Sequence, residues 1–327
     1  MTDMLRYDGR AVLVTGAGRG IGREHAILLA SRGAAVMVSD HGTDLFGAGG
    51  DAGPAEATVA HIRAAGGAAE CCLADLSDER GARAAVDATI EAFGRIDGIV
   101  HNAGFTLGGR DFGADTLGRL EAQLAINTRA GFSLAHRAWP VMQAQRFGRI
   151  VLTTSTALYG MASSIPYSTA KASVVGLTRG LAEAGAACGI TVNALAPAGA
   201  TRMAENLAES PFRTWFLRTM RPELVSPVVA VLLHDKCTVT GEIFVAGGGR
   251  VGRVVLAETH GYVSPDLSPE ELWAQLPGIL GATDYEYPRS TAESGALAAR
   301  LLGSDLAEPF YLSAGKSPAQ QASANDA

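Results

Sequence analysis

A tyrosine and a lysine stand four residues apart in the segment SIPYSTAKASVVGLTRGLAEA, as Tyr167 and Lys171. On a helix, positions i and i+4 share one face, so the phenol and the ammonium can serve one site. A nearby positive charge favours the phenolate, so we expect Lys171 to lower the pKa of Tyr167 from its ordinary value of about 10. Such a phenol could exchange a proton with a substrate as a general acid and base. An isolated pair of this kind can equally be a solvated helix face, so the rest of the chain has to decide.

A glycine-rich segment, TGAGRGIG at residues 15–22, directly follows the first predicted strand. Glycines let the backbone turn tightly and approach a pyrophosphate, which then binds at the N-terminus of the following helix. A tight turn without a ligand is the alternative. The segment predicts a dinucleotide site whose residues are Gly16, Gly18, Arg19, Gly20, Ile21 and Gly22.

Asp40 ends the second predicted strand, about twenty residues after the glycines. A carboxylate there can accept hydrogen bonds from the adenosine ribose and would repel a 2′-phosphate. Arg19 acts in the opposite direction, because a guanidinium could pair with that phosphate. We expect NAD rather than NADP, since one exposed arginine would hardly offset the carboxylate. Asp40 could instead be a plain turn residue at the end of its strand.

The apolar residues along the chain alternate between strand-like and helix-like spacing. Strands are expected at residues 11–14, 35–39, 70–73, 98–101, 149–153, 191–195 and 242–246. Helices are expected at residues 21–32, 56–65, 78–93 with Ser77 as its cap, 116–142, 166–187, and 226–234 with Ser226 as its cap. This alternation is typical of a parallel sheet covered by helices on both faces. We therefore predict a doubly wound α/β (Rossmann) domain with about seven strands over residues 1–250.

Beyond residue 250 the pattern changes. A capping box, Ser268 to Glu271, predicts a short helix to about Leu276. The extension at residues 251–310 contains apolar side chains such as Trp273 and Leu280, so we expect it to pack on the catalytic domain or on a neighbouring subunit. The composition of residues 311–327 predicts a flexible tail.

Composition excludes several classes of protein. The formal net charge of -6 argues against a nucleic-acid partner or an acidic membrane surface. No window of 18 uninterrupted apolar residues occurs, and the N-terminus has no apolar h-region, so we expect no membrane contact and a cytoplasmic location. The four cysteines form no C-x-x-C, and we expect them to be buried free thiols. The seven histidines are scattered, so no metal site is expected.

Taken together, these features resemble the short-chain dehydrogenase/reductase family over about residues 8–250. Besides the glycine segment, the matching positions are Asp75 and Leu76, Asn102, Ala103 and Gly104, Asn127 in LAINTRAG, Ser155 in TTS, Tyr167 and Lys171, and Pro197 and Thr201. The resemblance implies an enzyme that interconverts a secondary alcohol and a ketone with a nicotinamide dinucleotide.

The resemblance also implies roles for the catalytic residues. Tyr167 would be the acid/base, and Lys171 and the oxidised nicotinamide ring would lower its pKa. Lys171 would also hold the nicotinamide ribose. Ser155 would position the substrate oxygen, and Asn127 would hold a water in the proton path. Ser155 stands twelve residues before Tyr167 instead of the usual thirteen, so Thr154 remains an alternative. Asn127 could also merely cap or kink its helix.

Within the family, the runs NALAPAGATRM, EIFVAGGGRVGRV and SPEELWAQLPGI are similar to the (3R)-hydroxyacyl-CoA dehydrogenase part of the multifunctional enzyme type 2 of β-oxidation. This similarity implies an apolar small-molecule substrate, an acyl-CoA or alternatively a steroid, and a homodimer or homotetramer built through the helix at 166–187. The chain ends in Asn-Asp-Ala and not in Ser-Lys-Leu, which favours a freestanding cytoplasmic relative. The alternative is a protein that binds a dinucleotide but is not an enzyme. The intact Ser/Tyr/Lys set argues against this alternative.

Overall fold

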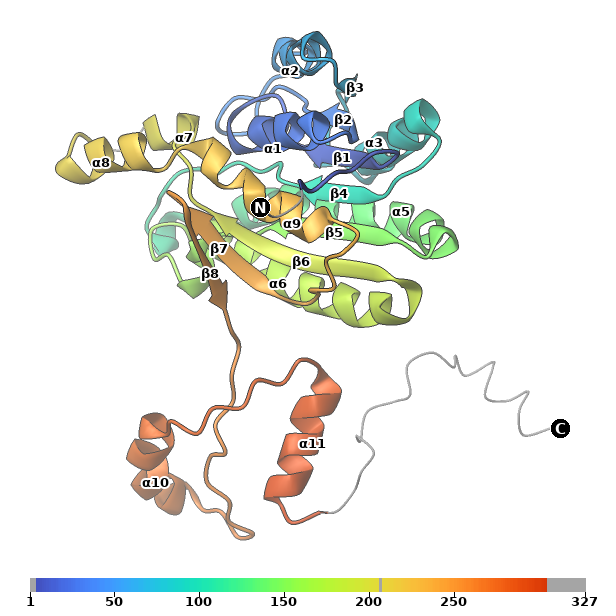
Figure 1. The fold of residues 1–327 in the computed structure, drawn as a ribbon. Coiled ribbons are helices and arrows are strands. Elements are labelled where there is room, and N and C mark those ends of the chain that lie inside the picture. Colours follow the sequence, from blue (N-terminus) through green and yellow to red (C-terminus); the bar gives the residue numbers. More distant parts are fainter. Residues whose placement is uncertain (1–3, 206–207, 305–327) are drawn as a thin grey trace, which may run out of the picture. The chain divides into compact units, whose positions relative to one another are not determined.

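The computed structural model describes residues 4–205 and 208–304 of the chain. Its internal contacts divide the chain into two compact units, residues 1–254 and residues 255–327. The first unit contains the sheet and its covering helices, and the second contains two helices, α10 and α11 (Figure 1).

The first unit is built on one eight-stranded sheet with the order β3-β2-β1-β4-β5-β6-β7-β8. Seven of its strands run parallel to one another: β1 (Ala11–Thr15), β2 (Ala35–Ser39), β3 (Ala68–Cys72), β4 (Gly98–His101), β5 (Gly148–Thr153), β6 (Ile190–Pro197) and β7 (Ile243–Gly247). The order reverses between β1 and β4, and open sheets of this kind bind ligands at the carboxyl ends of the strands beside such a reversal. The predicted doubly wound α/β class is confirmed.

The eighth strand, β8 (Arg250–Val254), runs antiparallel to β7 and pairs Ile243 with Val254. Gly248 and Gly249 form the turn with positive φ angles of 57° and 82°, as a tight hairpin requires. The predicted domain boundary after residue 250 cuts this strand, and only about seven strands were expected. The strand is missed because RVGRV, at the edge of the sheet, lacks a continuous apolar run.

Helices cover both faces of the sheet (Figure 1). The core on one face includes residues of α1 (Gly20–Ser31), α2 (Gly53–Ala64) and α9 (Ser226–Leu233). The core on the other face includes residues of α3 (Glu79–Phe93), α5 (Ala130–Gln145) and α6 (Ile165–Gly185). Neighbouring residues of β1 supply both cores, Val12 to the first and Leu13 to the second, because side chains alternate along a strand.

The predicted helix at 116–142 is one helical run that changes its pitch. It consists of α4 (Leu117–Leu124), a π-helical turn η2 (Ala125–Arg129), and α5, which continues to Gln145. Arg146 ends the run with a φ of 51°. Apolar spacing alone could not show the π turn, which changes the register of every side chain after it.

Two predicted caps are wrong. The carboxylate of Asp78, and not Ser77, caps α3 by accepting a hydrogen bond from the Arg80 N–H at 2.7 Å. Ser226 lies inside the first turn of α9, and its Oγ is 2.8 Å from Nδ1 of the buried His25.

The cysteines are less buried than expected. All four are free, but Cys71 is exposed and Cys72, Cys188 and Cys237 are half-buried. Cys71 and Cys72 belong to the edge strand β3, which packs mainly against α2 and less against α3, so both thiols remain at least partly accessible to solvent.

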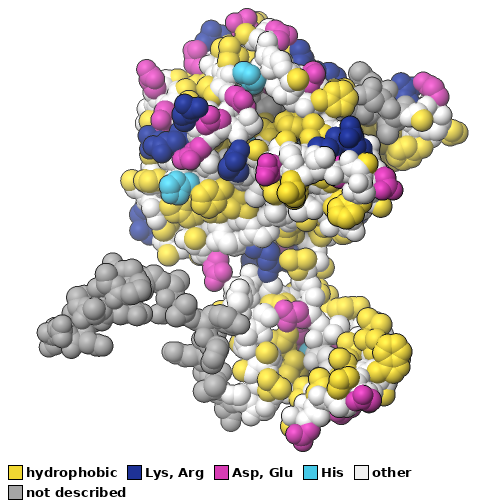
Figure 2. Space-filling view, turned by 180° about the vertical axis from the view of Figure 1, so that it is seen from behind, with side chains coloured by type: hydrophobic (Ala, Val, Ile, Leu, Met, Phe, Trp, Pro, Cys, Tyr) yellow, Lys and Arg dark blue, Asp and Glu magenta, His cyan; other side chains and the backbone are white. Residues whose placement is uncertain are grey.

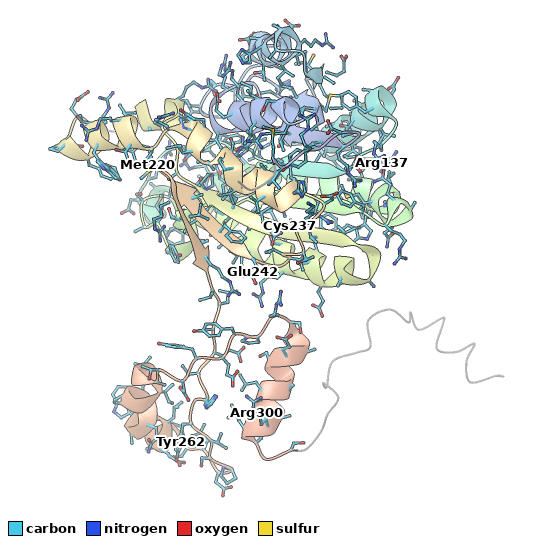
Figure 3. All side chains as sticks on the ribbon, in the orientation of Figure 1. Arg137, Met220, Cys237, Glu242, Tyr262 and Arg300 are labelled. Atoms are coloured by element: carbon cyan, nitrogen blue, oxygen red, sulfur yellow. The ribbon has the colours of Figure 1, made fainter. Side chains whose placement is uncertain are left out.

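Shorter elements complete the first unit. They are η1 (Phe112–Ala114), η3 (Thr156–Tyr159), η4 (Ala186–Cys188), α7 (Arg202–Glu205), α8 (Pro211–Thr219) and η5 (Pro222–Leu224). After α8 the chain returns to the sheet at Met220 (Figure 3), whose carbonyl accepts the Ala200 N–H. The Met220 sulfur packs closely against Gly247 and Gly248 at the end of β7.

The second unit contains α10 (Pro269–Gly281) and α11 (Thr291–Leu301). Ser268 caps α10 as predicted, by accepting the Glu271 N–H at 3.1 Å, but the helix continues beyond Leu276 to Gly281. Arg300 on α11 donates to Glu286 at 2.8 Å (Figure 3). The predicted tail at 311–327 lies outside the described residues.

Large apolar side chains remain on the surface of this second unit. Trp273 and Leu280 of α10 are each 77% exposed. Figure 2 shows the apolar side chains gathered on part of the unit's surface.

None of the helices in the described part of the chain combines the length and the apolarity that crossing a membrane requires.

Candidate active site

One cavity of about 1090 Å³ contains most of the predicted site. The predicted residues that line it are Gly16, Arg19, Gly20, Ile21, Asp40, Asp75, Leu76, Asn102, Ala103, Gly104, Ser155, Tyr167, Lys171, Pro197 and Thr201. Gly18, Gly22 and Asn127 do not line it. Most of the lining residues follow the carboxyl ends of β1, β2, β3, β4, β5 and β6, where the fold predicts a ligand.

Tyr167 and Lys171 lie in the first two turns of α6, which begins at Ile165 with Pro166 in its first turn. Proline is favoured there because the first helical N–H groups have no partner within the helix. Lys171 is only 4% exposed, and its Nζ donates to the carbonyl of Thr153 at 2.9 Å. The same Nζ is 5.8 Å from the centre of the Tyr167 ring, so the two side chains share one site.

Burial dominates the titration of both groups. It raises the pKa of Tyr167 above its ordinary value, and a hydrogen bond with Ser155 only partly opposes this. Burial also lowers the pKa of Lys171 to about 7. The expectation that Lys171 lowers the pKa of Tyr167 is therefore wrong for the protein's own atoms. The reason is that removing both groups from water penalises the phenolate and the ammonium alike.

The two candidate hydroxyls after β5 point to different partners. Thr154 is 1% exposed and donates to the carbonyl of Lys171 at 2.6 Å, so its hydroxyl holds α6 against the sheet. Ser155 Oγ accepts the Ala157 N–H at 3.2 Å, and the Ser155 side chain also forms a hydrogen bond with the phenol of Tyr167. This arrangement favours Ser155 as the hydroxyl that contacts a substrate.

Asn127 lies in the π turn and is 1% exposed. Its Nδ2 donates to the carbonyl of Gln123 at 2.8 Å and to Gln123 Oε1 at 3.1 Å. Among the described residues, no atom forms a hydrogen bond with its Oδ1. A side chain added at Gly104 would lie 2.9 Å from that Oδ1 and 3.5 Å from Lys171 Nζ, so both atoms face the same glycine. A buried acceptor without a partner, beside Lys171, suits a residue that holds a water. Gln123, which orients the Asn127 side chain, was not predicted from the sequence.

The glycine segment leaves room for a phosphate group. Gly16 has a φ of 65°, and a Cβ there would come within 2.8 Å of the Ala103 backbone. Gly20 has a φ of 55° and opens α1, whose N-terminus has no side-chain cap and no acidic residue in its first turn. Backbone N–H groups at such a helix start bind anions. These residues therefore fit the pyrophosphate of a dinucleotide.

Asp40 connects the end of β2 to the glycine segment. Its carboxylate accepts the Gly18 N–H and the Gly42 N–H, each at 2.7 Å. Asp40 therefore stabilises the turn after β2, as the alternative interpretation proposed. Its carboxylate also lines the cavity. Arg19 is directed to Asp51, with 3.4 Å between Nη2 and Oδ2.

Several residues that line the cavity belong to no recognisable sequence motif, so they were not predicted from the sequence. Three groups are involved: the loop residues His41, Thr43, Asp44, Leu45 and Gly47, the arginines Arg129 and Arg202, and the α8 residues Phe212 and Phe216. The unusual length of the loop after β2 was the only available signal. Phe212 and Phe216 form an aromatic cluster with Trp215, with ring centres 5.7 to 6.4 Å apart.

The family model described as short chain dehydrogenase matches residues 10–211 of the chain. The chain belongs to this family. It is therefore an oxidoreductase of the short-chain dehydrogenase type that acts on CH–OH groups and binds a nicotinamide dinucleotide.

Three relatives show the range of the family around this chain. Peroxisomal multifunctional enzyme A of Dictyostelium discoideum is 35% identical over 90% of the chain, which spans 66% of that enzyme. A short-chain type dehydrogenase/reductase of Mycobacterium tuberculosis is 36% identical over 84% of the chain and 96% of its own length. The (2S)-[(R)-hydroxy(phenyl)methyl]succinyl-CoA dehydrogenase subunit BbsD of Thauera aromatica is 32% identical over 74% of the chain and 96% of its own length.

Solved structures of this family have the same fold. A short chain dehydrogenase from Mycobacterium avium superimposes with a TM-score of 0.72 at 33% identity, covering 86% of the chain and 97% of the other protein. A 7α-hydroxysteroid dehydrogenase in complex with NADH and 7-oxo glycochenodeoxycholic acid has a TM-score of 0.67 at 29% identity, covering 75% of the chain and 95% of that enzyme.

Proposed function

We propose that this short-chain dehydrogenase interconverts (3R)-3-hydroxyacyl-CoA and 3-ketoacyl-CoA with NAD(H). The observation that carries the proposal is one cavity that joins Ser155, Tyr167 and the buried Lys171 to an apolar wall containing Phe212 and Phe216. An acyl chain could lie against that wall while its hydroxyl reaches Tyr167. The Thauera relative, whose name gives a hydroxyl-bearing succinyl-CoA as its substrate, supports a CoA thioester.

The proposed chemistry divides between the cofactor and the chain. When bound, the nicotinamide ring accepts or returns the hydride. In oxidation Tyr167 gives its phenol proton to the path through Lys171 and takes the hydroxyl proton of the substrate; in reduction it donates its proton to the substrate oxygen and is reprotonated by the same path. Ser155 donates a hydrogen bond to that oxygen. Lys171 holds the nicotinamide ribose and passes the proton towards a water on Asn127 Oδ1. In this scheme Asp75 and Leu76 would hold the adenine, and Asn102, Ala103, Pro197 and Thr201 would line the nicotinamide side.

The preference for NAD over NADP is part of the proposal. The Asp40 carboxylate stands where a 2′-phosphate would be repelled, and Arg19, which could attract that phosphate, is directed to Asp51. The structural relative solved with NADH is consistent with this choice.

A hydroxysteroid is the second candidate substrate. The aromatic cluster on α8 could contact a flat ring system as well as an acyl chain, and the 7α-hydroxysteroid dehydrogenase is a structural relative. The two candidates differ in the CoA moiety, so competition by free CoA distinguishes them.

The decisive experiment is a turnover screen with the purified chain. Substrates would be 3-hydroxyacyl-CoA esters of several chain lengths, hydroxysteroids and simple secondary alcohols, each with NAD and NADP, with Tyr167→Phe as the control. We expect the highest kcat/KM with a (3R)-3-hydroxyacyl-CoA and NAD, together with inhibition by free CoA. A preference for steroids, or NADH binding without turnover of any substrate, would contradict the proposal.

We further propose a homodimer or homotetramer built through α6. Where a side chain would extend from Gly176 and Gly180 there is open space, as a close helix contact between two copies requires. The exposed Trp273 and Leu280 of the second unit also need a partner surface, on the first unit or on another copy. Light scattering of the full chain and of a variant ending at Val254 tests both points. The expected cytoplasmic location stays a prediction.

A further inference from the structure

His101 is a buried histidine that the proposed chemistry does not use. It is the last residue of β4, it directly precedes Asn102, and it is 2% exposed. Its two ring nitrogens contact segments that are far apart in the sequence. Nδ1 is 3.0 Å from Thr15 Oγ1, at the start of the glycine segment, and Nε2 is 2.9 Å from the carbonyl oxygen of Ile126 in the π turn.

The surrounding hydrogen bonds fix the proton on this ring. Thr15 Oγ1 already accepts the N–H groups of Asn102 and Ala103, each at 3.1 Å. A hydroxyl has two acceptor positions and one proton, so the remaining Thr15 proton points to His101 Nδ1. The ring is therefore neutral and carries its proton on Nε2, which donates to Ile126. Burial, with the charge of Lys171, accordingly lowers the pKa of His101 to about 4.

The carbonyl that His101 holds is one residue before Asn127. Asn127 is tied to Gln123 through its Nδ2 alone, so the direction of its orphaned Oδ1 depends on the backbone of the π turn. The ring of His101 also packs against the next turn, since a side chain at Gly131 would come within 3.2 Å of its Cδ2. His101 thus contacts the π turn by one hydrogen bond and by van der Waals packing.

We propose that His101 is a positioning residue for the dehydrogenase reaction: by holding the Ile126 carbonyl, it keeps the π turn in the register that directs Asn127 towards Lys171. Through Thr15 it also ties that turn to the glycine segment, so the proton path and the cofactor loop share one fixed point. This inference rests on the role proposed above for Asn127. His101 touches neither the substrate nor the cofactor in this scheme.

Two substitutions separate the two hydrogen bonds. The amide of Asn at position 101 reaches about as far as Nδ1, so His101→Asn keeps the contact with Thr15 and loses Ile126. The longer amide of Gln reaches about as far as Nε2, so His101→Gln keeps the contact with Ile126. We expect His101→Asn to lower kcat about tenfold, the effect of losing one well-oriented hydrogen bond, while KM and the Kd for NADH change less than about twofold. His101→Gln should retain most of kcat.

A double-mutant cycle shows whether the effect passes through Asn127. In an Asn127→Ala background, His101→Asn should cost little further activity. An equal loss in both backgrounds would mean that His101 only supports the fold, and the inference would be overturned. If His101→Asn does not fold, His101→Gln decides alone: a loss of kcat at unchanged melting temperature and unchanged NADH affinity contradicts the inference. Wild-type kcat in Asn127→Ala would also overturn it, whereas the dehydrogenase function itself is judged by Tyr167→Phe.

Discussion

The two ends of the cavity are built in different ways. At the catalytic end, Lys171 lines the cavity and Asn127 lies beside the lining; both are on helices, and they are 4% and 1% exposed. At the adenosine end, the wall is the loop that follows β2, and the side chains of the Arg19–Asp51 ion pair are 38% and 61% exposed. In the proposed function, chemistry is therefore positioned by packed elements in a low dielectric, whereas the choice between NAD and NADP would depend on more solvated charges. Substitutions at the first end should have large effects that are insensitive to salt, and those at the second should have small effects that salt weakens.

The largest effect is expected from Tyr167→Phe. The ring and its packing remain, and only the transferable proton is lost, so turnover should fall by about 10²–10⁴-fold while NADH affinity stays the same. Stopped-flow or steady-state measurement of NADH formation, with NADH fluorescence titration, checks both. Turnover close to that of the wild type would mean that Tyr167 and Lys171 are only a packed helix face.

A smaller loss is expected for Ser155→Ala, on the order of 10²–10³-fold in kcat, because a positioned donor to the substrate oxygen is removed. Thr154→Val is the matched control. It removes the neighbouring hydroxyl, which donates a hydrogen bond to the Lys171 carbonyl. We expect Thr154→Val to lower the melting temperature and to lower kcat less than Ser155→Ala does. The reverse order of the two kcat values would assign the substrate contact to Thr154.

The pH dependence of ketone reduction tests the buried lysine. Because burial lowers the pKa of Lys171 to about 7, its ammonium is present below that pH and is lost as the pH rises through it. Tyr167, whose pKa burial raises, stays protonated over this range and can still donate. We expect kcat for reduction to fall above about pH 7, up to tenfold per unit at the steepest, and the residual activity of Lys171→Arg to lack this decline. A flat profile from pH 6 to pH 9 in the wild type would place the lysine pKa elsewhere.

The smallest effects are expected at the adenosine end. Asp40→Asn removes the charge and leaves one acceptor oxygen for the N–H groups of Gly18 and Gly42, so the ratio of kcat/KM for NAD over NADP should fall about tenfold at low salt. Asp51→Asn should change that ratio less than about fivefold, since it only releases Arg19 from an exposed ion pair. Both changes should shrink at high ionic strength. A wild-type enzyme that prefers NADP would show that Arg19 outweighs Asp40.

The features that the sequence predicted correctly share one property, which is that they are local. Continuous apolar runs placed the seven parallel strands, because both faces of the sheet are buried, and 3.6-residue spacing placed most helices, because one face of each is buried. The glycine segment before α1 and the spacing of Tyr167 and Lys171 on α6 are likewise contained in a few residues. They predict a dinucleotide site and a proton donor, and the roles assigned to the individual residues stay predictions.

What the sequence could not determine depends on contacts between distant segments. The polar strand β8 forms because the edge of β7 has free backbone groups with which it can pair. The π turn at Asn127 forms hydrogen bonds with other elements, among them the one between His101 and the Ile126 carbonyl. Thr154 and Ser155 are adjacent and chemically alike, and only the position of α6 gives them different partners. The direction of the Tyr167 pKa shift was predicted wrongly for the same reason: neighbouring charge can be inferred from spacing, but desolvation is set by everything that packs around the group, and only the tertiary structure determines it.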